Sequence, residues 1–366
     1  MTRRTSVILA FAALLLACDE ATDPPAHQAH VPVIHVPTRD GASVALHRRA
    51  LPGAPPVLLV HGISSNHHFW DLMPGRSLAQ HLHAEGFDVW NMDLRGHGSA
   101  RTLPDGSPQP APWAIDHYGQ HDLPAAIAHI QAATGQSQLG YVGHSMGGMV
   151  LAIHLATSTD PGLFAAVTVG SPLDFRDPDL LVRSALGLPA LPVAIPTPRA
   201  AWVGARMRAL RPILTDDVLY NTDAIAVDAA ITMLERIVSP LAPGEVAQLA
   251  TSTADGRFLS ADGTVDYGAA LAEVDLPMLL LAGRLDRTVT PDRVRAYHDA
   301  LGSEDKSMVV LSRAHGFRYD YGHLDLGVGD AAHTEVFPRI SAFLRSRAPD
   351  SARPADTSPS TEGPPP

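Results

Sequence analysis

Several short apolar runs in this chain are each followed by a segment with helical periodicity. "PVLLV" (residues 56–60) is apolar at every position, and "MLLLAG" (residues 278–283) repeats the pattern near the C-terminus. A strand that is apolar on both faces belongs inside a sheet that is covered on both faces, which is typical of parallel sheets. The alternation therefore predicts an α/β fold with a mostly parallel central sheet and helices on both of its faces.

Composition limits the kinds of partner that the chain can have. Of its 366 residues, 45% are hydrophobic and 18% are charged, which is enough apolar material for a large core. A formal net charge of −11 argues against a nucleic-acid partner, which would need a basic face. The sequence contains neither a P-loop nor the HExxH spacing of zinc proteases, and His67 and His68 read as an exposed loop pair without further ligands at a suitable spacing. We therefore expect no metal and no organic cofactor.

The N-terminus has the features of an export signal. Arg3 and Arg4 precede an apolar run at residues 7–17, which is too short to span a bilayer but typical of a signal-peptide core. The run ends at Cys18, the single cysteine of the chain, and "LLAC" resembles a bacterial lipobox, in which the cysteine is lipidated. We expect residues 1–18 to be a lipoprotein-type signal peptide and the protein to be anchored through Cys18 to a membrane of a bacterial cell envelope. A plain secretory signal is the alternative.

The remainder of the chain divides by composition. Residues 19–31 are polar and contain prolines, which predicts a flexible tether, and the Pro/Ser/Thr-rich residues 347–366 predict a disordered tail. Residues 32–346 form the folded domain. Within it, residues 173–266 interrupt the strand–helix alternation, with a proline-dense beginning followed by amphipathic stretches. We interpret this segment as a helical cap insertion over one end of the sheet; the alternative is a continuation of the main domain.

A serine follows one of the predicted strands in "GHSMG" (Gly143–Gly147), directly before a predicted helix. This G-x-S-x-G pattern between strand and helix places the serine on a tight turn, which predicts that Ser145 is a nucleophile. The N–H of Met146, at the start of the helix, would face a developing oxyanion. The loop "VHGISSNHHFW" follows an earlier strand and predicts a second oxyanion donor, the N–H of Ile63.

A serine nucleophile needs a histidine base that is oriented by an acid, and in this type of fold the acid precedes the histidine in the chain. Asp286 comes just after the predicted strand "MLLLAG", at its carboxyl end, and is our candidate for the acid. Asp174, which follows the preceding strand, is the alternative.

Five segments, taken together, resemble the α/β-hydrolase superfamily. They are "HGISSNHHFW", "DLRGHG", "GHSMGG", "GRLD" and "YGHLDL", and the resemblance extends from about residue 32 to about residue 345, apart from the insertion. Within the superfamily, "HDLPA" and "YGHLDL" are similar to segments of the acid lipases. The resemblance implies the α/β-hydrolase fold, and it implies that the histidine of "YGHLDL", His323, is the base. Methionine replaces the glutamine that follows the serine in acid lipases, which weakens any transfer of substrate range.

Spacing and resemblance favour different histidines. His315 lies 29 residues after Asp286, the more usual interval, whereas His323 lies 37 residues after it. Extra loop residues cost little free energy, so the longer interval does not exclude His323. Because His323 lies inside the segment that resembles the acid lipases, we favour it and keep His315 as the alternative. Asp325 is expected to stabilise the helix that follows.

These residues predict a serine hydrolase that cleaves carboxylic esters of hydrophobic, lipid-like substrates through an acyl-enzyme on Ser145. Two other readings stay open at this point. The same triad serves acyltransferases and cofactor-free oxidoreductases of the superfamily, and the chain could instead be a non-catalytic binding protein anchored to the envelope.

Overall fold

The computed structural model describes residues 31–176 and 219–349. The predicted signal peptide with Cys18, residues 19–30 of the predicted tether, the tail from residue 350 and residues 177–218 of the predicted insertion lie outside the described residues. The domain boundaries therefore stay predictions. In the described part of the chain, no helix is long and apolar enough to cross a membrane.

An eight-stranded sheet forms the centre of the molecule, in the order β1-β2-β6-β3-β7-β8-β9-β10. The pairs β1–β2 and β2–β6 are antiparallel, and the five other pairs are parallel, which confirms the predicted mostly parallel sheet. The strands are β1 (Val33–Pro37), β2 (Ser43–Arg49), β3 (Pro56–Val60), β6 (Asp88–Asp93), β7 (Leu139–His144), β8 (Leu163–Val169), β9 (Met278–Gly283) and β10 (Lys306–Leu311).

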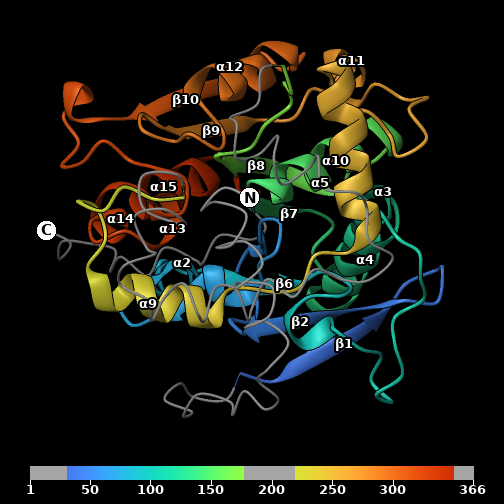
Figure 1. Cartoon of the computed structure of the whole chain (residues 1–366). Coiled ribbons are helices and arrows are strands. Elements are labelled where there is room, and N and C mark those ends of the chain that lie inside the picture. The colour runs from blue at the N-terminus through green and yellow to red at the C-terminus, as the bar shows by residue number, and fades with distance from the viewer. Residues whose placement is uncertain (1–30, 177–218, 350–366) are drawn as a thin grey trace, which may run out of the picture.

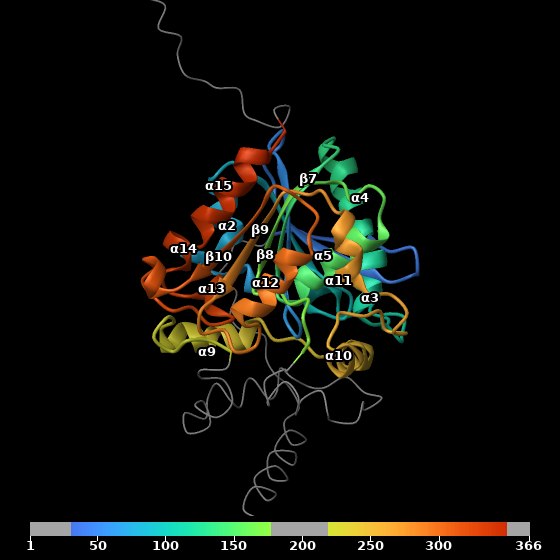
Figure 2. The same ribbon diagram turned by 90° about the horizontal axis from the view of Figure 1, so that it is seen from above.

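Helices cover both faces of this sheet, as Figure 2 shows with the sheet between two groups of helices. The alternating side chains of β3 explain why two cores are needed: Val57 and Leu59 belong to one hydrophobic cluster, and Leu58 and Val60 belong to the other. The helices on the Val57 side are α2 (Leu78–Ala84), α13 (Asp325–Val328), α14 (Ala332–Glu335) and α15 (Phe337–Arg347). Those on the Leu58 side are α3 (Ile115–His117), α4 (Leu123–Thr134), α5 (Met146–Thr157) and α12 (Pro291–Ala300).

The described part of the segment between β8 and β9 is helical. It contains α9 (Val227–Arg236), α10 (Pro243–Asp255) and the short α11 (Tyr267–Ala270). The buried side of α9, with Ala229 and Met233, packs into the cluster on the Val57 side of the sheet, whereas Leu249 of α10 packs against the other cluster. Figure 2 shows α9 and α10 at the same end of the molecule, below the two groups of helices. The amphipathic pattern of this segment thus becomes two helices that lie against different halves of the core.

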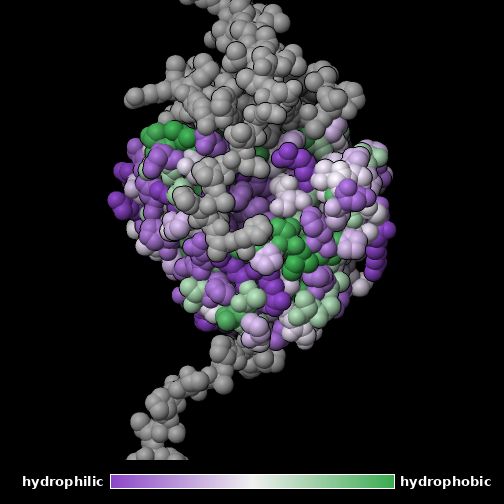
Figure 3. Space-filling model, turned by 90° about the horizontal axis from the view of Figure 1, so that it is seen from below, coloured by the Kyte–Doolittle hydropathy of each residue, from purple (hydrophilic) through white to green (hydrophobic). Residues whose placement is uncertain are grey.

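The surface is mostly hydrophilic on the face that Figure 3 presents, where hydrophobic residues gather in small patches. The large hydrophobic side chains that are exposed in the described part of the chain are Val33, Val227, Val265 and Leu285.

Candidate active site

Ser145 lies in a strained turn between β7 and α5. Its φ of 50° and ψ of −113° fall in a region that non-glycine residues rarely adopt, and its side chain is buried, with 6% of its surface exposed. The glycines on either side permit this turn. A Cβ on Gly143 would lie 2.6 Å from the carbonyl carbon of Gly147, and a Cβ on Gly147 would lie 2.7 Å from the carbonyl oxygen of Val60. The G-x-S-x-G pattern is therefore a requirement of backbone packing at this point.

Asp286 and His323 form a buried pair. Nδ1 of His323 donates to Oδ2 of Asp286 at 2.7 Å, and the other carboxylate oxygen of Asp286 accepts the N–H of Val289, also at 2.7 Å. Asp286 is 2% exposed and His323 is 4% exposed. Because the carboxylate fixes Nδ1 as the protonated nitrogen, Nε2 of His323 is left as the basic one.

Adjacent strand ends bring this pair beside the serine. The N–H of Ser145 donates to Val169 at the end of β8, and a Cβ on the next residue, Gly170, would lie 3.2 Å from Nδ1 of His323. On the other side, the ring of His144 lies 4.6 Å from the ring of His323, centroid to centroid. Gly170 has a φ of 57° and was not singled out in the sequence; the structure shows that any larger residue there would press on the His323–Asp286 pair.

The two alternatives considered in the sequence have other partners. His315 is exposed, and its Nδ1 donates to the carbonyl oxygen of Val310 at 2.9 Å. The carboxylate of Asp174 forms an ion pair with Arg176 at 2.6 Å. It is His323, and not His315, whose ring contacts Asp286.

The loop after β3 lies against the serine turn, because a Cβ on Gly62 would be 3.1 Å from the Cβ of Ser145. Ile63 follows directly in this loop. Met146 is the first residue of α5, and the first N–H groups of a helix have no acceptor within the helix. The loop that contains Ile63 thus lies against the serine turn, and Met146 follows Ser145 directly.

The loop after β3 that carries Ile63 and His67, which we call the oxyanion loop after the role expected for Ile63, is also tied to the helical segment between β8 and β9. The hydroxyl of Ser64 donates to the carbonyl oxygen of Ser239 at 2.6 Å, and the amide of Asn66 donates to that of Arg236 at 2.9 Å. Because Ser64 has a φ of 52°, these bonds hold a strained residue beside Ile63. Sequence reasoning did not find this connection, since the partners lie far apart in the chain.

Asp325 does more than start a helix. It is the first residue of α13, but its carboxylate accepts the N–H of Gly322 at 2.8 Å and the N–H of Asn221 at 3.0 Å. Complete burial raises the pKa of Asp325 to about 7, against the opposing effect of these two hydrogen bonds. The carboxylate therefore holds the loop that carries His323, which differs from the expected role in the helix that follows.

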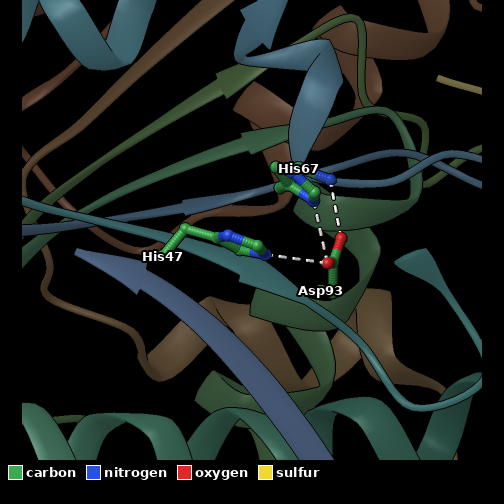
Figure 4. Close-up of side chains that lie close together, drawn as sticks. All are labelled: His47, His67 and Asp93. Carbon is green, nitrogen blue, oxygen red and sulfur yellow. Dashed lines mark hydrogen bonds and ion pairs between the residues drawn. The ribbon is translucent and has the colours of Figure 1, made fainter. Parts of the chain in front are cut away.

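The expectation of an exposed loop pair at His67 and His68 is wrong. Both residues are partly buried, and Nδ1 of His67 lies 2.8 Å from Oδ2 of Asp93. Nε2 of His47 lies 3.0 Å from the same oxygen, so that two histidines meet one carboxylate (Figure 4). Burial acts to raise the pKa of Asp93, but the attraction and hydrogen bonds of His67 and His47 outweigh it and hold this pKa well below its usual range.

A cavity of about 540 Å³ opens beside Asp286, lined in the described part of the chain by Tyr220, Asn221, Arg284, Leu285, Asp286, Arg287, Thr290, Pro291 and Asp292. Neither Ser145 nor His323 lines it. We therefore do not assign this cavity as the place where the reacting group binds.

Together, the strand order, the helices on both faces and the serine turn after β7 define the α/β-hydrolase fold. A family model described as "alpha/beta hydrolase fold" matches residues 55–190 of the chain, the part that contains the oxyanion loop and Ser145.

The curated relatives that match include animal lipases, and these match in part. Lipase member K of Homo sapiens is 37% identical over 146 residues, which are 37% of this chain and 36% of that protein. Gastric triacylglycerol lipase of Homo sapiens is 42% identical over 113 residues, covering 30% of this chain and 28% of that lipase. Lipase 1 of Drosophila melanogaster is 39% identical over 119 residues, covering 31% of this chain and 27% of that lipase. The chain thus matches about a quarter to a third of the length of these relatives.

Solved structures match over much more of the chain. An esterase from the thermophile Thermogutta terrifontis has a TM-score of 0.58 and 20% identity, and the match covers 87% of this chain and all of the esterase. A membrane phospholipase A described as a bacterial virulence factor has a TM-score of 0.57 and 18% identity, covering 93% of this chain and 90% of that protein. At these identities the likeness establishes the fold.

Proposed function

We propose that this protein is a serine hydrolase that cleaves carboxylic esters through an acyl-enzyme on Ser145. The observation that carries the proposal is the buried hydrogen bond between His323 and Asp286 beside the strained turn of Ser145. A serine hydroxyl is a weak nucleophile, and a histidine whose tautomer is fixed by a buried carboxylate supplies the base that it needs.

In the proposed reaction, Nε2 of His323 takes the proton of Ser145 as Oγ attacks the ester carbonyl. His323 then gives that proton to the departing alcohol, and the C–O bond of the ester breaks to leave the acyl-enzyme. Water, deprotonated by His323, attacks the acyl carbon; the bond between that carbon and Oγ of Ser145 then breaks, the carboxylic acid leaves, and His323 returns the proton to Oγ. The carboxylate of Asp286 orients the ring of His323 and stabilises the imidazolium.

The N–H groups of Ile63 and Met146 would bind the oxyanion of each tetrahedral intermediate. Donors held rigidly before the reaction are more effective than donors that must reorient, and loss of one donor from such a site typically costs about 10²–10³ in rate. The hydrogen bonds of Ser64 and Asn66 to the helical segment support this rigidity on the side of Ile63.

We further propose hydrophobic, lipid-like esters as the substrates. The partial matches to proteins named lipases support this class, as does the apolar composition of residues 173–266 in the sequence.

A fluorophosphonate probe tests the nucleophile. We expect covalent labelling at Ser145 of the full chain and no labelling of Ser145→Ala, with the site mapped by mass spectrometry. Absence of label from the wild-type protein, while its fold is intact by circular dichroism, would exclude the serine hydrolase.

A panel of p-nitrophenyl esters of increasing chain length tests the substrate class. We expect kcat/KM to rise from acetate to longer acyl chains, because each buried methylene contributes about 0.8 kcal/mol to binding. A second series with an added alcohol measures transfer against hydrolysis: if the acyl group passes mainly to the alcohol, the protein is an acyltransferase.

The place of the protein in the cell remains a proposal from the sequence. We propose that Cys18 carries a lipid that anchors the protein to a bacterial envelope membrane. Expression of the full chain and of Cys18→Ser in a bacterium, followed by detergent phase separation, would test it: the wild-type protein should enter the detergent phase and the variant should not.

A further inference from the structure

We propose that His47, His67 and Asp93 form a binding site for a divalent transition-metal ion, with zinc as the expected occupant. This inference does not depend on the proposed hydrolase activity. The site lies on the β2–β6 side of the sheet, and in the strand order β3, β7 and β8 separate it from β9, which Asp286 follows.

The three candidate ligands come from three different elements of the fold. His47 lies on β2, Asp93 is the last residue of β6, and His67 begins the short 3-10 helix η1 (His67–Phe69). The strands β2 and β6 pair directly, so the backbones under His47 and Asp93 are fixed relative to each other. Ligands on paired strands need little rearrangement to bind an ion, and this lowers the entropy cost of binding.

The distances between the ligand atoms suit one ion. Nε2 of His47 and Nδ1 of His67 lie 3.0 Å and 2.8 Å from Oδ2 of Asp93, and the three atoms all lie within 4.8 Å of one another. Zinc binds histidine nitrogens and carboxylate oxygens at about 2.0–2.2 Å in tetrahedral geometry, so neighbouring ligand atoms around it are about 3.3–3.6 Å apart. An ion can therefore bind between the three atoms once the two histidine nitrogens move away from Oδ2 of Asp93 by about 0.3–0.8 Å.

The histidines can change from hydrogen-bond donors to metal ligands without a change of charge. When the nitrogens that face Asp93 carry hydrogens, they donate to the carboxylate. For a metal ion, the hydrogen of His47 moves to Nδ1 and that of His67 moves to Nε2, so each ring stays neutral. Asp93 then contributes the single negative charge, and a set of two imidazoles and one carboxylate suits zinc, cobalt and nickel.

The surroundings hold the carboxylate in place and leave a route for the ion. The N–H of Ser99 donates to Oδ2 of Asp93 at 2.8 Å, and the N–H of His67 donates to Oδ1 at 2.7 Å. The side chains of His47 and His67 are 10% and 15% exposed, whereas that of Asp93 is fully buried. An ion can thus enter from the histidine side, where water can complete its coordination.

A bound ion would cross-link the sheet to the oxyanion loop. His67 lies in the same loop as Ile63, and its carbonyl oxygen already accepts a hydrogen bond from Asn91 of β6. Binding to the folded state alone raises stability with ion concentration, so the ion should raise the melting temperature of the protein.

The test is binding of Zn²⁺ to the metal-stripped full chain by isothermal titration calorimetry, with Co²⁺ absorption as a second probe. His47→Gln and His67→Asn are the informative variants, because each amide nitrogen can still donate to Asp93 but cannot replace the imidazole ligand. His315→Asn is the matched control at an exposed histidine. We expect one Zn²⁺ per wild-type chain, a loss of affinity of at least about tenfold in the two variants, as for changes at the supporting residues of metal sites, and no change in the control.

Two results would overturn the proposal: absence of saturable Zn²⁺ binding by the folded wild-type protein, or equal affinity in wild type, His47→Gln and His67→Asn. If the variants do not fold, the wild-type protein still decides the question. Zn²⁺ should then protect His47 and His67, and not His315, from modification by diethyl pyrocarbonate, as mapped by mass spectrometry. Equal modification with and without Zn²⁺ would show that the cluster is held by hydrogen bonds only.

Discussion

Two buried aspartates in this protein each accept a hydrogen bond from a histidine ring, but their surroundings differ. Asp286 follows β9 and binds one histidine, His323, and one backbone N–H. Asp93 ends β6 and meets two histidines, His47 and His67, as well as two backbone N–H groups. Both carboxylates stand at the carboxyl end of a strand of the same sheet.

The two sites differ in the group that lies next to the contact between histidine and aspartate. Beside the His323–Asp286 pair lies the strained turn of Ser145, so the free nitrogen of the histidine can serve a nucleophile. Beside Asp93 a second imidazole stacks on the first, with ring centroids 3.6 Å apart. A His–Asp contact by itself therefore identifies neither catalysis nor metal binding, and the neighbouring group decides which chemistry is available.

Replacement of His323 should have the largest effect on activity. In the proposed mechanism, His323→Ala deprives Ser145 of its base, and we expect kcat for a p-nitrophenyl ester to fall by about 10⁶, the loss typical of serine–histidine–aspartate hydrolases. His315→Ala is the matched control and should keep nearly full activity. Full activity in His323→Ala, or a comparable loss in His315→Ala, would contradict the assignment.

Replacement of Asp286 should have a smaller but still large effect. Asp286→Asn can hold the ring of His323 in the wrong tautomer, and we expect kcat to fall by about 10⁴. Asp174→Asn, at the alternative acid, should leave kcat unchanged, because that carboxylate is paired with Arg176. Equal losses of activity in the two variants would contradict the assignment of Asp286 as the acid.

Replacement of Asp93 should affect stability. Asp93→Ala leaves two histidines and two backbone N–H groups without their acceptor, and we expect the free energy of unfolding to fall by about 3–5 kcal/mol. The control is Asp299→Ala, which removes an exposed contact of 2.9 Å with His298 and should cost about 0–1 kcal/mol. Urea denaturation of the three proteins gives the values, and equal losses in both variants would show that burial of Asp93 does not matter.

The smallest expected effect is the pH dependence that Asp325 gives to the stability of the protein. Its pKa is raised to about 7 from a usual value of 3.8, so between these values the folded state binds more protons than the unfolded state. The contribution of this carboxylate to stability should therefore fall as pH rises through that range. From about pH 5 to about pH 8, we expect the free energy of unfolding of the wild type to fall relative to that of Asp325→Asn, as measured by urea denaturation. A difference that is constant, or that shifts in favour of the wild type, would contradict the raised pKa.

Much of the fold could be predicted because its signals are local. The apolar runs that became β3 and β9 lie on consecutive residues, and the glycines around Ser145 specify its turn without reference to the rest of the chain. The amphipathic stretches within residues 173–266 likewise predicted helices with one buried side, and α9 buries Ala229 and Met233 on such a side.

The sequence by itself thus determined the α/β architecture and the position of the serine turn, because strand composition and turn sterics act over a few residues. Only the tertiary structure decided which histidine contacts Asp286, since the loop between β10 and α13 could have brought either His315 or His323 to that carboxylate. The cluster of His47, His67 and Asp93 was invisible in the sequence for the same reason. Its members lie on separate elements with no diagnostic spacing in the sequence. They meet only because β2 and β6 pair and the oxyanion loop brings His67 against Asp93.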